Sequence, residues 1–235
     1  MNRNTLKLIA IVAMVIDHVA WAFVPTSSVA GQVMHAIGRL TGPIMFYFIG
    51  EGYIHTRSLK NYITRMAIFA AISNFAFGFF QTGELTFFPC SVIFTLLLGI
   101  LAIHAYNQIQ QPTLRWTVIV GLCLLSMLGD WPIIGVVMCL GFYIYRNNFK
   151  DMAIFVVICQ LVLSLLTMVG PLDERGIYGV VMDNLWGFGV VFVLPLLYSY
   201  NGEKGRGKYS NWFFYIFYPL HLFVIGGLRY FILIS

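Results

Sequence analysis

The sequence has little charge for its length, and this shortage excludes most classes of soluble protein. Of 235 residues, 10% are charged and 60% are hydrophobic, and the mean hydropathy is +0.83. An ordinary soluble domain has about a quarter of its residues charged. The polar connections between apolar runs are also short, roughly a dozen residues at most, which leaves no room for a separate soluble domain. We therefore expect one integral membrane domain over residues 1–235.

Further absences limit the kinds of functional site and fold that we expect. The four cysteines lie in or beside apolar runs without C-x-x-C spacing, and we interpret them as buried small hydrophobic residues. The five histidines are scattered, so no metal site is expected. The runs show no short polar/apolar alternation, which excludes a transmembrane β-barrel. The net charge of +5 is attributed to membrane orientation and not to nucleic-acid binding.

What the sequence does contain is a series of apolar runs, each long enough to cross a hydrocarbon core of about 30 Å. They predict an all-α, polytopic transmembrane bundle of about nine helices. The predicted helices are 6–24, 33–54, 62–81, 88–106, 113–129, 131–145, 152–170, 182–200 and 211–231. The helices at 113–129 and 131–145 are short, with Gly129 and Pro132 between them, so one of the two could be re-entrant or tilted.

The basic residues predict the orientation of these helices. With the N-terminus in the cytoplasm, only Arg39, Arg175 and Arg229 fall outside, which leaves 11 of the 14 Lys and Arg residues on the cytoplasmic side. This bias follows the positive-inside rule and predicts an N-in/C-out protein of the cytoplasmic membrane that crosses it many times. The outer loop near 170–182 and the cationic inner loop near 201–211 carry much of the remaining charge.

The first predicted helix contains the most informative residues. Asp17 and His18 are adjacent, deep in an apolar run, where ionisable groups are costly unless they face protein or water. Lys7 precedes His18 by about three helical turns, so both side chains lie on one face of the helix, roughly 16 Å apart. Asp17 points about 100° away from His18. We expect Asp17 to pair with a cation on another helix.

Other polar residues in the apolar runs have structural or catalytic interpretations. Arg39 is near the outer end of the second predicted helix, where it either extends to the membrane interface or binds a substrate. Pro43 predicts a kink in that helix. His221 follows Pro219 in the last helix, where its ring could bond a carbonyl that the proline frees. Neutral side chains expected to hydrogen-bond between helices are Asn74, Ser91 and Thr95.

Three stretches in the same order resemble the TraX family of membrane acetylases associated with pilin maturation: LKLIAIVAMVIDH, IGRLTGPIMFYFIGEGY and FYPLHL. SVIFTLLLGILA and WPIIGVVMCLGFYIY also resemble that family. The matching positions are Asp17, His18, Arg39, Pro43 and His221. The family is similar in logic to multi-helix membrane acyltransferases, whose first helix carries a basic residue about three turns before an essential histidine. The resemblance implies transfer of an acetyl group from acetyl-CoA to an acceptor amine, such as a pilin N-terminus.

In this interpretation, the cytoplasmic ends of the first three helices bind acetyl-CoA and His18 is the general base. The cations expected to hold the polyanionic nucleotide are Lys7, Arg57, Lys60 and Arg65. His18 would remove a proton from the acceptor as it attacks the thioester. Arg39 would bind the acceptor or stabilise the oxyanion, and Asp17 would orient a catalytic partner or balance a buried cation. His221 is the alternative base, or the carrier of a transient acetyl group.

Other functions fit the same residues. The acceptor could be a sugar hydroxyl at the cell surface in place of an amine. The buried ionisable residues could instead form a proton relay in a small transporter, although the chain has no internal repeat. A non-enzymatic assembly factor would leave the buried charges unexplained. The expected partners are membrane lipid, acetyl-CoA and a pilin-like subunit or surface glycan, with no nucleic acid.

Overall fold

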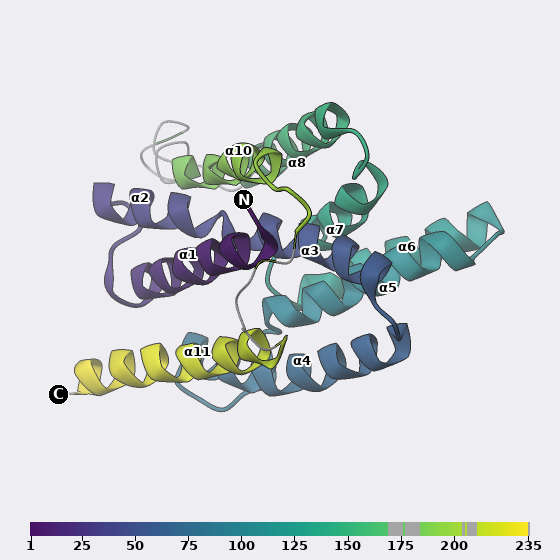
Figure 1. Cartoon of the computed structure of the whole chain (residues 1–235). Coiled ribbons are helices and arrows are strands. Elements are labelled where there is room, and N and C mark those ends of the chain that lie inside the picture. Colours follow the sequence, from purple (N-terminus) through teal and green to yellow (C-terminus); the bar gives the residue numbers. More distant parts are fainter. Residues whose placement is uncertain (169–175, 177–183, 204, 206–210, 235) are drawn as a thin grey trace. The chain divides into compact units, whose positions relative to one another are not determined.

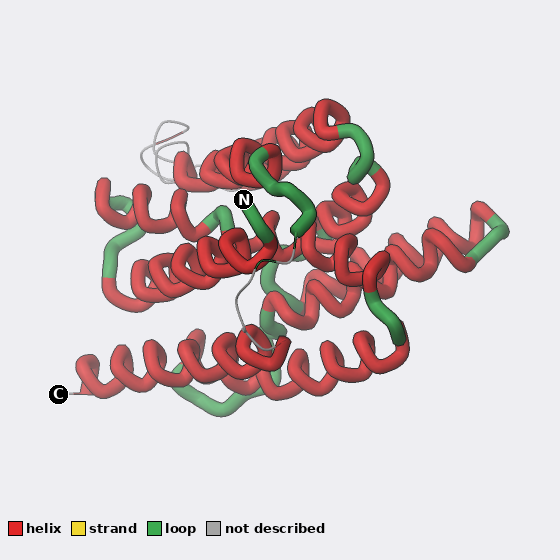
Figure 2. Tube along the Cα trace, in the orientation of Figure 1, coloured by secondary structure: helices red, strands yellow, loops and turns green. Residues whose placement is uncertain are grey.

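The computed structural model contains helices and loops, and no β-strand, among the residues that it describes (Figures 1 and 2). It describes residues 1–168, 176, 184–203, 205 and 211–234. The all-α part of the prediction is confirmed over these residues. Within them, three helices are long and apolar enough to cross a membrane, namely Arg3–Phe23, Leu59–Thr82 and Phe213–Ile232. The nine-span count and the N-in/C-out orientation stay predictions, and the loops near 170–182 and 201–211 lie largely outside the described residues.

The helices group into two compact units. The N-terminal unit comprises Met1–Ile44 and Asn148–Lys208, and the second unit comprises Met45–Asn147 and Tyr209–Ser235. Helix α3 (Thr41–His55) begins in the first of these and continues into the other. Whether the chain is a single domain over residues 1–235 stays a prediction.

The N-terminal unit is organised around a short helix, α2, which packs against both α1 and η2. Its elements are α1 (Arg3–Phe23), α2 (Val29–Gly38), α8 (Phe149–Met168), the 3₁₀ helix η2 (Leu185–Phe192) and α10 (Val193–Tyr198). The helix predicted over 182–200 is therefore a 3₁₀ helix followed by a short α-helix in its described part. Gly189 allows the close approach of η2 to α2, because a Cβ there would collide with the backbone of Ala36.

The second predicted helix, 33–54, is two helices with a turn at Arg39 and Leu40 between them. Pro43 has no N–H to donate to the carbonyl of Arg39, four residues earlier, and its ring crowds that carbonyl. Pro43 instead lies in the first turn of α3, where backbone N–H groups have no partner within the helix in any case. The prediction of a kinked continuous helix is wrong, since the proline ends one helix and starts the next.

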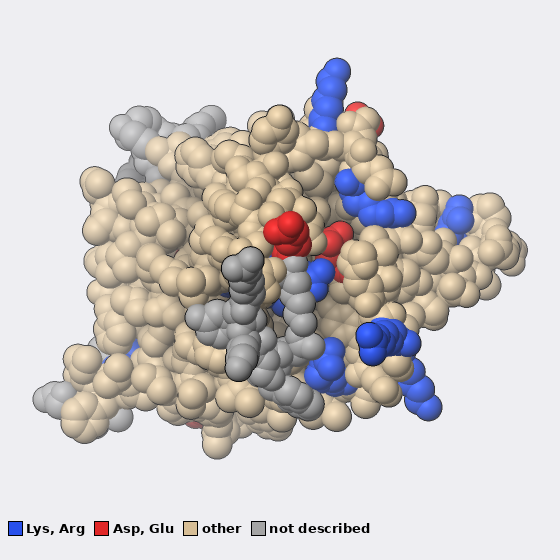
Figure 3. Space-filling view, viewed as in Figure 1, with Lys and Arg blue, Asp and Glu red and all other residues tan. Residues whose placement is uncertain are grey.

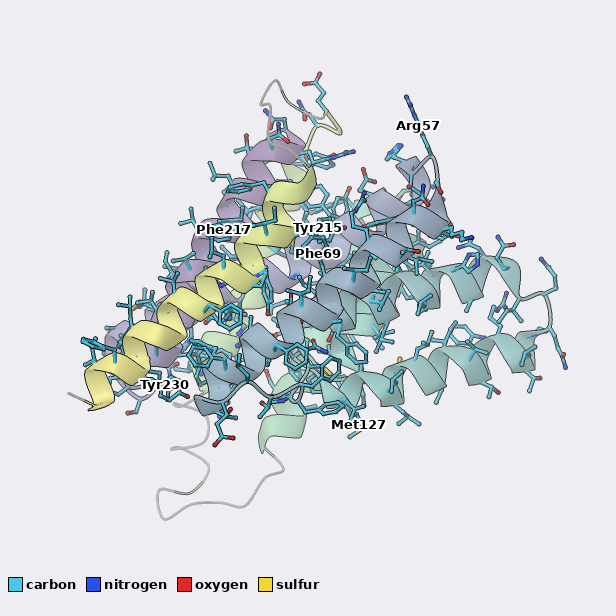
Figure 4. All side chains as sticks on the ribbon, turned by 90° about the horizontal axis from the view of Figure 1, so that it is seen from below. Arg57, Phe69, Met127, Tyr215, Phe217 and Tyr230 are labelled. Carbon is cyan, nitrogen blue, oxygen red and sulfur yellow. The ribbon has the colours of Figure 1, made fainter. Side chains whose placement is uncertain are left out.

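In the second unit, α5 (Val92–Gln108) packs against three other helices, α4, α6 and α7. The remaining elements are α4 (Leu59–Thr82), α6 (Pro112–Leu125), the 3₁₀ helix η1 (Ser126–Leu128), α7 (Ile134–Ile144) and α11 (Asn211–Ile234). Helices α4 and α11 lie side by side (Figure 1). Between them the rings of Phe69 and Tyr215 stack with centroids 4.9 Å apart (Figure 4).

Neutral side chains tie the helix ends of the second unit together. The side-chain oxygen of Asn74 accepts hydrogen bonds from the backbone N–H of Ser91 at 2.9 Å and from its hydroxyl at 3.0 Å. The hydroxyl of Thr95 donates to the carbonyl of Asp130 in the connection before α7. These contacts agree with the structural interpretation of Asn74, Ser91 and Thr95, and they fix the start of α5 against its neighbours.

The outer faces of the long helices are apolar. Leu8 and Val12 of α1 are 50% and 51% exposed, and Phe231 of α11 is 73% exposed. Most of the surface in Figure 3 is uncharged. Side chains of this kind on a helix of membrane length are expected to contact lipid, because contiguous apolar surface is unfavourable in water.

Candidate functional site

Asp17 of α1 and His35 of α2 form a titratable pair inside the N-terminal unit. Nδ1 of His35 lies 2.8 Å from Oδ1 of Asp17. Asp17 lies six residues before the end of α1 at Phe23, and His35 lies six residues after the start of α2 at Val29. Equal distances from the connecting loop bring the two residues to the same level of the hairpin. The partner of Asp17 lies on another helix, as predicted, but it is a histidine and not the cation that the sequence led us to expect.

A glycine allows α2 to approach α1 at this level. A Cβ at Gly38 would collide with the carboxyl group of Asp17. Gly38 is the last residue of α2. It lies about one turn after His35, on the face of α2 that contacts α1. The absence of a side chain at Gly38 thus leaves the space that the carboxyl group of Asp17 occupies.

Two indole rings flank the ring of His35. The centroid of Trp21 is 4.4 Å from that of His35, and the centroid of Trp186 is 5.5 Å away. The guanidinium carbon of Arg39 lies 4.2 Å from the ring centroid of Trp186, a cation–π contact. The backbone N–H of Trp186 donates to the side-chain oxygen of Gln32 at 3.1 Å, which fixes η2 on α2. We term this group the α1–α2 cluster and define it by Asp17, Trp21, His35, Arg39 and Trp186.

The hydrogen bond to Asp17 determines where the proton of His35 lies. An ionised carboxylate only accepts hydrogen bonds, so Nδ1 of His35 carries the hydrogen. The His35 side chain is fully buried, and its Nε2 has no hydrogen-bond partner among the described residues. In the neutral ring this nitrogen has a lone pair, so Nε2 is the atom that can take up a proton.

His18 has a similar arrangement with a backbone carbonyl in place of a carboxylate. Its Nδ1 lies 2.9 Å from the carbonyl oxygen of Met14, one turn earlier in α1. A carbonyl only accepts, so Nδ1 donates and Nε2 is the basic nitrogen of the neutral ring. Helix α1 is continuous from Lys7 to His18, so the predicted separation of roughly 16 Å along its axis applies.

His221 belongs to the second unit and lies in α11. Its Nδ1 is 3.0 Å from the carbonyl oxygen of Phe217, and its ring stacks on the ring of Phe217 with centroids 5.3 Å apart. The prediction that it bonds a carbonyl freed by Pro219 is wrong in detail, because the carbonyl four residues before Pro219 is that of Tyr215.

The cations predicted to bind the nucleotide occur in both units. Lys7 is half-buried in the N-terminal unit. In the second unit, Arg57 and Lys60 are exposed around the start of α4, and Figure 4 shows Arg57 extending away from the ribbon. Arg65 is half-buried, with its guanidinium carbon 5.3 Å from the ring centroid of Tyr215. Within the second unit, Arg57 and Lys60 therefore offer charge to solvent, and Arg65 is stacked on an aromatic ring.

Neither the cysteines nor a metal cluster adds to this site. All four cysteines are free thiols, three of them buried and Cys123 half-buried, which agrees with their interpretation as small hydrophobic residues. Within the described ranges, no group of three or more His, Cys, Asp or Glu side chains could hold a metal ion. That the protein needs no metal stays a prediction.

The sequence analysis did not single out His35, Trp21 or Trp186. A signal for His35 was present in the loop length, since residues equally far from a short interhelical loop meet across an antiparallel hairpin. Trp186 joins the cluster from about 150 residues further along the chain, and no local pattern predicts that contact.

The helices and the α1–α2 cluster define a membrane-associated helical protein in which ionisable side chains meet between apolar helices, with the ring of His35 fully buried. More particularly, the chain belongs to the TraX family, because residues 2–229 match the family described as TraX protein. It is also similar to the probable fimbrial assembly protein FimC, serogroup H1, of Dichelobacter nodosus, with 29% identity over 249 residues that cover 99% of this chain and 100% of that protein. No solved structure matches the chain. The family membership indicated by the sequence motifs is confirmed.

Proposed function

We propose that this protein is an acetyltransferase of the cytoplasmic membrane that crosses the bilayer many times, oriented N-in/C-out, and acts in pilus assembly. It transfers the acetyl group of acetyl-CoA to an acceptor amine, and the proposed acceptor is a pilin-type N-terminus. The observation that carries the proposal is His18 beside the Asp17–His35 pair, within a helix of membrane length. Ionisable groups at such depth are expensive and mark functional sites. The pilus role is supported by the similarity to FimC, whose name describes a probable fimbrial assembly protein.

The proposed chemistry uses His18 as general base. Nε2 of His18 removes a proton from the acceptor amine as the amine nitrogen attacks the thioester carbonyl carbon. The C–S bond then breaks, and the departing sulfur of CoA takes that proton from His18. Arg39 is the proposed partner of the developing oxyanion, and its stacking on Trp186 supports this role because a held guanidinium needs little reorganisation.

Acetyl-CoA binding is assigned to cations near the cytoplasmic ends of the helices. CoA is a polyanion, and Lys7, Arg57, Lys60 and Arg65 are basic residues that the proposed orientation places on that side. Arg57 and Lys60 are the exposed members of this set in the second unit. Proposed partners are therefore acetyl-CoA, membrane lipid and a pilin-like subunit.

The test is thiol release from acetyl-CoA by the purified protein in detergent, with separate pools of amine and hydroxyl acceptors. Release that depends on the amine pool supports the proposal, and mass spectrometry of the acceptor should show one added acetyl group. Release that depends on the hydroxyl pool would replace the amine by a sugar-type acceptor. Release without any acceptor would point to an acetylated histidine and favour His221 as its carrier.

A second measurement separates an enzyme from a proton-coupled transporter. A ligand that binds only the folded state raises the melting temperature. Added CoA should therefore stabilise the protein, and desulfo or dephospho analogues should do so less. No stabilisation together with no thiol release would contradict the proposed acetyl transfer.

A further inference from the structure

His35 combines three properties that a structural histidine does not need. Its side chain is fully buried, its Nδ1 is held by Asp17 at 2.8 Å, and its Nε2 has no hydrogen-bond partner among the described residues. A buried polar atom without a partner costs free energy, and folded proteins rarely leave one. Nitrogen atoms in that condition are candidates for a bond that forms only when a ligand or a proton arrives.

The Asp17–His35 pair has the arrangement of a carboxylate-supported base. The carboxylate fixes the tautomer through Nδ1, leaves the lone pair on Nε2, and stabilises the imidazolium that forms when Nε2 takes a proton. The flanking rings of Trp21 and Trp186 hold the orientation of the imidazole. The side chain of Asp17 is 16% exposed and Trp21 is 43% exposed, so the pair lies close to the surface of the unit although the His35 ring itself is buried.

The stoichiometry of amine acetylation provides a proton for such a group to accept. An α-amino group has a pKa of about 7.7–8.0, so at pH 7 most of the acceptor is an ammonium ion that cannot attack. The ammonium ion must lose one proton before attack and a second when the amide forms. His18 accounts for the second proton in the proposed function, and the first has no acceptor there.

We propose that His35 is a second catalytic residue, whose Nε2 removes the first proton from the acceptor ammonium, with Asp17 as its orienting carboxylate. This inference rests on the proposed acetyl transfer. In the first step a proton moves from R–NH₃⁺ to Nε2 of His35, which leaves R–NH₂. The amine then attacks the thioester carbon, a second proton passes through His18 to the sulfur, and the C–S bond breaks. His35 releases its proton to water, so the products are the amide, free CoA and one proton.

The charged groups around His35 set the pH dependence of this step. Asp17 and His18 are on α1, Arg39 follows α2, and η2 carries no ionisable side chain. Of these groups, Asp17 is hydrogen-bonded to Nδ1 of His35, and the guanidinium group of Arg39 stacks on Trp186 beside the ring. Because Nε2 of His35 removes the first proton, the wild-type enzyme is expected to use the ammonium form of the acceptor. A variant without this base can use only the free amine.

The decisive variant is His35→Asn. The asparagine amide nitrogen takes the place of Nδ1 and keeps a donor for Asp17, while the titratable Nε2 is removed. With a peptide α-amine as acceptor, kcat/KM of the variant should follow the free-amine fraction. The deficit relative to wild type should be about tenfold at pH 7, larger at pH 6, and nearly absent above pH 9. With an aminooxy acceptor, which is neutral at pH 7, the deficit should be nearly absent at pH 7 as well.

Asp17→Asn is the second variant, because it keeps an acceptor oxygen for His35 but removes the charge. It should show the same pH trend with a smaller deficit at pH 7. His55→Gln is the matched control, since that histidine is 60% exposed and should retain wild-type activity at every pH. Thermal melting of each variant identifies loss of folding separately from loss of proton transfer.

These measurements distinguish failure of the proposed role of His35 from failure of the proposed acetyl transfer. Wild-type thiol release together with a His35→Asn deficit that is the same at all pH values and with both acceptors would overturn the base role of His35. An active His35→Asn without any deficit at pH 6 would overturn it too. Absence of acceptor-dependent release by the wild type would overturn the acetyl transfer itself, and the role of His35 with it.

Discussion

Two groups of polar side chains, one in each unit, make different contacts, although the second unit also contains a buried titratable residue, His221. In the second unit, Asn74, Ser91 and Thr95 are neutral, and each makes hydrogen bonds that hold a helix end or a connection in place. In the N-terminal unit, the α1–α2 cluster contains a carboxylate, an imidazole and a guanidinium, and Nε2 of His35 lacks a partner among the described residues. Neutral paired groups are typical of structural contacts, and buried ionisable groups are typical of chemistry. The comparison predicts that mutations in the first set lower stability and those in the second lower activity.

The largest effect is expected at His18, because the proposed reaction passes a proton through its Nε2. His18→Gln should lower kcat by about 10²–10⁴-fold while the protein still folds and inserts. The measurement is single-turnover thiol release alongside thermal melting. His55→Gln, an exposed histidine of α3, is the control and should leave turnover unchanged. Full turnover by His18→Gln would remove His18 from the mechanism.

The next largest effect is expected at Asn74, and it concerns stability. Asn74→Ala leaves two buried donors of Ser91 without an acceptor, and each such loss costs about 1–3 kcal/mol. The free energy of unfolding in detergent should therefore fall by about 3 kcal/mol, with turnover of the remaining folded protein close to wild type. Thr64→Ala, at an exposed position of the same helix α4, should change stability by less than about 0.5 kcal/mol. Equal stability of the two variants would contradict the structural role of Asn74.

A smaller effect is expected from a methyl group at Gly38, which tests the close approach of α1 and α2. The added Cβ collides with the carboxyl group of Asp17 and should displace it from His35. Gly38→Ala is expected to lower turnover about tenfold, or about 1.4 kcal/mol, and to destabilise the protein by about 1–2 kcal/mol.

The matched control is Gly121→Ala in α6, where a Cβ would meet nothing within 4 Å. Alanine is the better helix former by about 1 kcal/mol, so this variant should be at least as stable as the wild type and fully active. A Gly38→Ala variant that behaves like Gly121→Ala would show that the Asp17–His35 distance does not matter for function.

The long helices could be predicted from sequence because their signal is local. Predicted spans of 6–24, 62–81 and 211–231 correspond to α1, α4 and α11 within three residues at each end. In a bilayer an uninterrupted apolar run forms a helix, because a helix makes all of its backbone hydrogen bonds within the segment. The prediction failed at 33–54, where we expected Pro43 to kink one continuous helix. Pro43 cannot donate to the carbonyl of Arg39, and its ring crowds that carbonyl, which is enough to end a helix.

Some residues of the candidate site could be predicted from the sequence and others could not. Asp17, His18 and Arg39 are conspicuous because charged or titratable residues are rare inside apolar runs. His35 lies only two residues after the predicted start of its helix, where a histidine attracts no attention, and its importance follows from the hairpin register with Asp17. Trp186 reaches the cluster through the packing of η2 on α2, which is tertiary information that no single segment carries.

The smallest effect is expected at the exposed cations. Lys60→Gln should raise the KM for acetyl-CoA by about two- to fivefold without changing kcat, because a solvent-exposed charge contributes less than about 1 kcal/mol. The difference from wild type should shrink as salt is added, since screening weakens interactions between exposed charges. Lys150→Gln, an exposed lysine of α8 without a proposed role, should leave the KM unchanged. If both variants raise the KM equally, CoA responds to overall positive charge and not to a site at the start of α4. If only Lys60→Gln does so, the start of α4 contributes to donor binding.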